Sequence, residues 1–130
     1  MDYDGLNRGI TEIQKEEAIQ EVLLSIGIPP NLLGYTYIVY GVELILSDPE
    51  YMRGITTRLY VDIAKKFNTK STSVERSIRH AISIGWLYGS VDYINSMFKN
   101  CINPEKGVPS NSLFFSRLYY FLRDYRNGAA

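Results

Sequence analysis

Apolar residues recur every three or four positions along most of this chain, which places them on one face of an α-helix. The first such stripe consists of Ile19, Val22, Leu23 and Ile26. Thr11 followed by Gln14 has the spacing of a capping box, so the sequence predicts a helix that begins near Thr11, after a flexible lead-in over residues 1–12. Gly27 and the prolines at 29–30 end this helix.

A second helix is predicted from about Leu32 to Ser47. Its apolar stripe consists of Tyr35, Ile38, Val39, Val42, Ile45 and Leu46. Gly34 and Gly41 lie inside this helix, where each costs roughly 1 kcal/mol relative to Ala. We therefore expect these two glycines to mark close contacts between helices.

The stretch from Asp62 to Trp86 carries the pattern of a helix-turn-helix. Its first helix is expected to follow a loop over residues 54–57, with Thr56 or Thr57 as the cap. The positions that define the motif are Ile63, Ala64, Phe67, Asn68 and Val74. The small Ala64 lets the second helix cross closely, Phe67 closes the core between the two helices, and Asn68 supplies the turn because asparagine adopts the left-handed conformation at low cost.

The second helix of this pair, predicted over residues 72–88, buries one stripe and exposes the other. The buried stripe consists of Val74, Ile78, Ala81, Ile82 and Gly85. At about 100° per residue, Arg76 lies opposite this stripe and points outward. Thr72 and Glu75 have the spacing of a second capping box, and Gly89 is expected to close the helix.

Two further helices are predicted after Gly89. Asp92 is expected to cap a short helix that buries Ile94, Met97 and Phe98. After an irregular segment over residues 99–109, a last helix from Ser110 buries Phe114, Leu118, Phe121, Leu122 and Tyr125. The sequence therefore predicts about six helices, no strand and a single all-α domain over residues 13–127, with the helix-turn-helix at about 57–88.

Net charge is zero, but the charges are unevenly distributed. Residues 1–50 contain nine acidic and two basic residues (net −7), whereas residues 51–130 contain five acidic and twelve basic residues (net +7). The basic half contains the helix-turn-helix, so the distribution favours double-stranded DNA as a partner.

The N-terminal turns of a recognition helix reach base edges in the major groove. The residues predicted to contact bases are therefore Ser73, Glu75, Arg76, Arg79 and His80. Residues near the turn are predicted to contact phosphates, and these are Lys65, Lys66, Lys70 and Thr72. The alternatives are that Glu75 only completes the capping box and that Arg76 and the lysines are ordinary solvated charges.

The run YVDIAKKFNTKSTSVERSIRHAI resembles the C-terminal DNA-binding effector domain of the stage-zero sporulation response regulator family of spore-forming Firmicutes. Further matching blocks are IGIPPNLLGYTY at 26–37, GIT at 54–56 and PSNS at 109–112, so that the likeness extends from about Glu17 onward. The resemblance implies a sequence-specific transcription regulator that binds tandem DNA sites. It also implies a contact between the sigma subunit of RNA polymerase and the region of about Tyr88 to Phe98.

Members of that family usually carry an N-terminal receiver domain, for which 130 residues leave no room. We therefore expect an excised domain or a stand-alone relative, monomeric in solution and paired on adjacent DNA sites.

Other classes of protein find little support in the sequence. It contains no glycine-rich phosphate loop, nucleophile elbow or paired metal ligands, so we expect no enzyme, no cofactor and no metal. His80 is the only histidine, which agrees with the absence of a catalytic or metal site. A single Cys, no signal peptide and no long apolar run favour a cytoplasmic protein. The main alternative is a helical protein-interaction module whose basic face meets an acidic partner.

Overall fold

The computed structural model of the chain describes the backbone of residues 3–98 and 107–126 and the side chains of residues 14–98 and 107–124. The elements are α1 (Tyr3–Ile26), α2 (Leu33–Ser47), the 3-10 helix η1 (Pro49–Arg53), the π-helical turn η2 (Ile55–Leu59), α3 (Tyr60–Phe67), α4 (Ser71–Tyr88), α5 (Val91–Phe98) and α6 (Asn111–Arg126). Over these described ranges the chain forms six α-helices and no strand, which confirms the predicted all-α fold.

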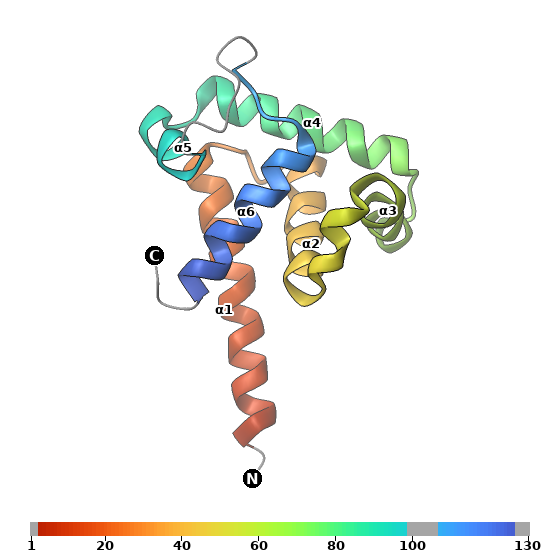
Figure 1. Ribbon diagram of the computed structural model, residues 1–130, viewed down its shortest axis with the longest axis vertical. Coiled ribbons are helices and arrows are strands. Elements are labelled where there is room, and N and C mark those ends of the chain that lie inside the picture. The colour runs from red at the N-terminus through yellow and green to blue at the C-terminus, as the bar shows by residue number, and fades with distance from the viewer. Residues whose placement is uncertain (1–2, 99–106, 127–130) are drawn as a thin grey trace.

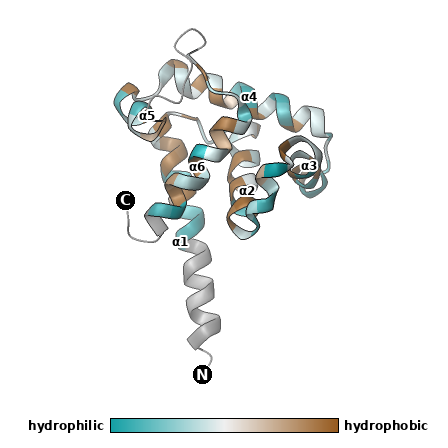
Figure 2. Cartoon of the chain, viewed as in Figure 1, coloured by the Kyte–Doolittle hydropathy of each residue, from teal (hydrophilic) through white to brown (hydrophobic). Residues whose placement is uncertain are grey.

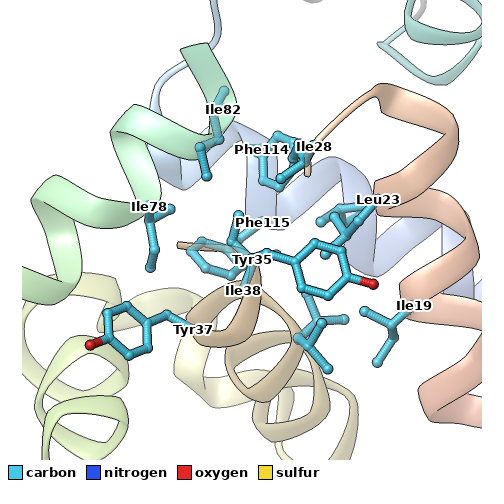
Figure 3. Packing of buried hydrophobic residues seen from close by; sticks show 14 of the residues in the cluster. Ile19, Leu23, Ile28, Tyr35, Tyr37, Ile38, Ile78, Ile82, Phe114 and Phe115 are labelled. Atoms are coloured by element: carbon cyan, nitrogen blue, oxygen red, sulfur yellow. The ribbon is translucent and has the colours of Figure 1, made fainter. Parts of the chain in front are cut away.

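Helix α2 lies at the centre of the bundle, with α4 across one of its ends and α1 and α6 along its sides (Figure 1). The hydrophobic residues of α1 and α2 lie mainly where these helices face the rest of the bundle (Figure 2). Ile78 and Ile82 of α4 point into the same core as Ile38 of α2 and Phe114 and Phe115 of α6 (Figure 3). Helix α4 therefore packs on a core to which both α2 and α6 contribute.

The predicted apolar stripes are largely confirmed by burial. The stripes of α1, α4 and α5 are buried at every predicted position. In α2, Leu46 is only half-buried, and in α6 the same holds for Phe121, while the side chain of Tyr125 lies outside the described residues. Phe115, which the predicted stripe of α6 omits, is completely buried.

Gly34 and Gly41 mark close helix contacts, as predicted. A Cβ atom on Gly34 would lie 2.1 Å from the carbonyl oxygen of Ser77 in α4, which is far inside van der Waals contact. A Cβ atom on Gly41 would lie 3.0 Å from Cδ1 of Ile63 and 3.1 Å from Cε1 of Phe115. The first glycine therefore sets the separation of α2 from α4.

A second pair of glycines joins the C-terminal ends of α1 and α4. Gly27 has a φ of +105°, and a Cβ atom there would lie 2.6 Å from Cα of Gly89. A Cβ atom on Gly89 would lie 1.6 Å from the carbonyl oxygen of Ile26. The two backbones thus touch directly, and Gly89 also closes α4, as predicted.

Several predicted helix starts are wrong. Helix α1 begins at Tyr3 rather than near Thr11, because no proline interrupts residues 3–11 and the capping-box spacing at Thr11 lies inside a continuous helix. Neither Thr56 nor Thr57 caps α3, since residues 55–59 form the π-helical turn that leads directly into it.

The caps of the last two helices come from serines. Ser90, rather than Asp92, caps α5, because its Oγ accepts a hydrogen bond from the backbone N–H of Tyr93 at 3.3 Å. The Oγ of Ser110 accepts a bond from the N–H of Leu113 at 3.1 Å, which agrees with the predicted start of α6.

Candidate nucleic-acid interface

The turn between α3 and α4 is built around Asn68. Asn68 has φ 53° and ψ 53°, the left-handed conformation, and no other described residue except glycine has a positive φ. Its backbone N–H and that of Thr69 both donate to the carbonyl oxygen of Ala64, the latter at 2.9 Å. This arrangement ends α3 and reverses the chain, so the role predicted for Asn68 is confirmed.

Phe67 anchors the turn against α2. Its side chain is half-buried, and its ring centroid lies 5.3 Å from that of Tyr37 and 5.7 Å from that of Tyr40, both on α2. Contacts between aromatic rings at these separations favour a fixed mutual orientation. The residue expected to close the core between α3 and α4 thus also attaches the turn to the central helix.

Helix α4 presents a polar face opposite its buried stripe. The exposed predicted residues of this face are Thr72, Ser73, Arg76, Arg79 and His80, whereas Glu75 is half-buried. Among the residues whose side chains are described, no carboxylate lies within ion-pair distance of Arg76. The guanidinium group of Arg76 therefore faces solvent with its donors available to a ligand.

Glu75 and Arg79 form an ion pair on this face. Nη2 of Arg79 donates to Oε1 of Glu75 across one helical turn. The side chain of Arg79 is 64% exposed and that of Glu75 is 38% exposed. Pairs of this kind contribute only about 0.3–0.5 kcal/mol. The pair orients both side chains without holding them strongly.

The predicted capping box of Thr72 and Glu75 does not form. Helix α4 begins at Ser71, so Thr72 already lies inside its first turn, and Lys70 occupies the cap position with no side-chain hydrogen bond. The capping-box spacing of Thr72 and Glu75 is therefore a coincidence, because the turn between α3 and α4 ends before Thr72. Glu75 is thereby released from capping and pairs with Arg79.

The three lysines predicted to contact phosphates are all exposed and flank the turn. Lys65 and Lys66 lie in the last turn of α3, and Lys70 immediately precedes α4. Nζ of Lys66 lies 5.8 Å from the centroid of the Tyr40 ring, a favourable cation–π distance. The structure therefore brings the predicted basic residues to the two sides of one turn.

Behind the polar face, Asn111 connects three helices, a contact that the sequence did not predict. Nδ2 of this buried side chain donates to Oη of Tyr60 and to the backbone oxygen of Glu75, each at 3.1 Å. Burial raises the pKa of Tyr60, and the hydrogen bond from Asn111 acts in the opposite direction. The one signal in the sequence was the block PSNS, which contains Asn111.

An open pocket of about 500 Å³ lies beside the polar face of α4. Its walls are formed by Glu75, Arg79 and Ser83 of α4, by Tyr60 and Thr56, and by residues 108–112. Asn111 and Tyr60 therefore form part of the support beneath Glu75 and Arg79.

Among the described residues, no three or more His, Cys, Asp or Glu side chains lie close enough together to hold a metal ion. Within the same ranges, every helix is too short or too polar to span a bilayer. His80 lies on the polar face of α4 together with Arg76 and Arg79.

These features define an all-α helix-turn-helix domain, with a left-handed turn, a small residue at the helix crossing and an exposed polar face on the second helix. A family model described as the sporulation initiation factor Spo0A C terminal matches residues 19–122, which is 104 of the 130 residues. The chain belongs to this family, a family of DNA-binding effector domains in sporulation rather than of enzymes.

Proposed function

We propose that the protein is a sequence-specific transcription regulator that reads the major groove of duplex DNA with α4. The observation that carries the proposal is Arg76, which is exposed, lies opposite the buried stripe and belongs to the first turns of the helix. A planar guanidinium can donate two parallel hydrogen bonds to O6 and N7 of guanine. Ser73 and His80 lie on the same face and complete the set of direct readers together with Glu75 and Arg79.

Glu75 and Arg79 read bases after their mutual pair has opened. Because both side chains are partly exposed, the pair costs little to break, and each group gains a stronger partner in the groove. The carboxylate of Glu75 can accept from the amino group of cytosine, and Arg79 can donate to guanine or to a phosphate. In the free protein the pair holds both side chains on the face of α4 that would meet the bases.

Lys65, Lys66, Lys70 and Thr72 contact phosphates and fix the register of α4 in the groove. Their placement on both sides of one turn matches the crossing of the backbone by a helix-turn-helix. The positive charge of residues 51–130 supports the same assignment.

The partners extend beyond DNA. We include contact with the sigma subunit of RNA polymerase through the region of Tyr88 to Phe98, where Tyr88 and Val91 are 75% and 68% exposed, respectively. Exposed apolar side chains of this kind favour protein contacts. Binding to chromosomal DNA would bring the protein to the bacterial nucleoid.

Selection of bound duplexes from a random pool tests this function. A single enriched element with a conserved guanine is the expected result, and its binding should fall steeply with salt. Retention of all sequences alike would contradict sequence-specific reading. Binding to an acidic protein with no retention of any duplex would instead favour the helical protein-interaction module.

A further inference from the structure

Asn111, the first residue of α6, is the one buried residue of polar or charged type among those whose side chains the structure describes. It is 8% exposed. A buried amide requires partners, because an unpaired polar group away from water is costly. The two hydrogens of its Nδ2 are matched by two acceptors.

Those acceptors lie on two other helices. One is Oη of Tyr60 at the start of α3, 51 residues away in the sequence. The other is the backbone oxygen of Glu75 in the second turn of α4, 36 residues away. A single side chain thus links α6 to both helices of the helix-turn-helix.

From this geometry we infer that Asn111 is a positioning residue for DNA reading, holding the first turns of α4 at a fixed rotation so that Glu75 and Arg76 meet the base edges. The inference rests on the proposed function. It assigns to α6, which carries none of the predicted readers, a part in sequence recognition.

The need for such a contact follows from the nature of the α4 interface. The stripe of α4 is apolar, and apolar burial is non-directional, so it resists separation more strongly than a small rotation. A hydrogen bond is directional and weakens steeply away from its preferred angle. Binding constellations must be held within about 0.5 Å and 10–20° of their productive geometry.

The place of the bond along α4 supports the same role. Asn111 binds the carbonyl of Glu75, whose side chain pairs with Arg79 and which directly precedes Arg76. All three residues belong to the predicted reading set. A rotation of α4 at this carbonyl would therefore displace the readers directly.

The test compares binding of the selected duplex with binding of a scrambled one. Asn111→Asp keeps the size of the side chain but removes both N–H donors. We expect the ratio of the two dissociation constants to fall about tenfold, in the range of one lost base contact. A purely structural role would lower the folded fraction and weaken both complexes by the same factor, leaving the ratio unchanged.

Asn31→Asp is the matched control, since it makes the same chemical and charge change at an exposed position between α1 and α2. Its ratio should equal that of the unchanged protein. Should Asn111→Asp fail to fold, Tyr60→Phe removes one acceptor and retains the buried ring, and it should lower the ratio by a smaller factor.

A measurement without DNA tests the bond itself. Burial raises the pKa of Tyr60 and the bond from Asn111 lowers it, so Asn111→Leu, which removes the amide donors but keeps the site filled, should raise that pKa further, as followed by NMR titration of labelled tyrosine rings. An unchanged pKa of Tyr60 overturns the inference. So does a raised pKa of Tyr60 if Asn111→Asp and Tyr60→Phe both leave the ratio of the two dissociation constants unchanged. Failure of the unchanged protein to discriminate between duplexes would refute the proposed function, and this inference with it, before any variant is compared.

Discussion

The backbone of Gly34 in α2 lies directly against the carbonyl oxygen of Ser77 in α4, where a single added methyl group would lie 2.1 Å from that oxygen. Because the obstacle is backbone rather than a flexible side chain, the added group can be accommodated only by moving one helix relative to the other. The position of α4 therefore depends on the absence of a side chain at Gly34 of its neighbour α2.

Gly34→Ala should destabilise the protein. Overpacking costs about 1–3 kcal/mol or more, which offsets the roughly 1 kcal/mol that alanine gains over glycine as a helix former. Chemical denaturation measures the change in the free energy of unfolding. Gly41→Ala is the comparison, since its nearest neighbours are the ends of the Ile63 and Phe115 side chains, and its loss should be smaller. Equal losses would show that the backbone contact has no special weight.

Arg76→Ala should weaken binding to the selected duplex by about 1–3 kcal/mol and relax discrimination at one guanine. The fold should survive, because the exposed side chain leaves the buried stripe intact. Arg76→Lys should restore charge but little specificity, since an ammonium group lacks the planar fork. Fluorescence anisotropy on specific and scrambled duplexes measures both effects.

Arg53→Ala removes the same charge from an exposed side chain in η1 and should leave discrimination unchanged. Equal weakening of the specific and scrambled complexes by Arg76→Ala would identify Arg76 as a phosphate contact. Base reading would then be reassigned to Glu75, Arg79 or His80.

Binding should depend steeply on salt. If about four to six phosphates are neutralised per domain, the logarithm of the association constant should fall with the logarithm of salt concentration at a slope of roughly −4 to −5. Lys66→Ala should make the slope shallower by about one unit without altering site preference. Lys15→Ala on α1 is the control and should leave the slope unchanged. A slope near zero for the unchanged protein would rule out electrostatic anchoring.

Replacement of Asn68 should reveal the cost of its left-handed backbone. Asn68→Ala should lower the free energy of unfolding by up to about 1 kcal/mol, because alanine keeps the Cβ atom that crowds the following carbonyl oxygen at positive φ but lacks the short polar side chain whose local hydrogen bonding offsets that cost in asparagine. Asn68→Gly should be close to neutral, since glycine adopts this conformation readily. Thermal or urea denaturation separates the two, and a larger loss for glycine than for alanine would contradict the argument.

The 130-residue chain should sediment as a monomer without DNA and form a two-protein complex on a duplex with two adjacent sites. DNA raises the effective concentration of one copy beside the other, so pairing needs little affinity between the proteins. Analytical ultracentrifugation measures both states. A stable dimer in the absence of DNA would refute this prediction.

The sequence predicted the faces of the helices better than their ends. The buried stripe of α4 follows from a periodicity of 3.6 residues, and burial agrees at every position from Val74 to Gly85. Helix starts were less predictable because capping signals are short and recur by chance. The spacing at Thr72 and Glu75 is one such coincidence, since α4 begins at Ser71.

The support of the candidate interface could not be predicted from the sequence. Asn111 lies between two serines at the start of the predicted last helix, and nothing local indicates burial. Its partners Tyr60 and Glu75 are brought to it only by the packing of three helices. By contrast, the half-exposed pair of Glu75 and Arg79 follows from the i, i+4 spacing of a helix, although the capping-box spacing had suggested another partner for Glu75.

The contact between Gly27 and Gly89 restricts the amino-acid substitutions that evolution can introduce at the junction of α1 with α4. Every missense change of a glycine codon introduces a Cβ atom, which at Gly89 would lie 1.6 Å from a carbonyl oxygen. A Cβ atom at Gly27 would collide with Gly89, and the φ of +105° at Gly27 would strain any residue other than glycine. No single substitution at either site is therefore free of a clash, and replacing both glycines adds a second Cβ atom without moving either backbone. The junction of α1 with α4 thus has no gradual path to another sequence, whereas the exposed residues of α4 can vary without altering the core beneath them.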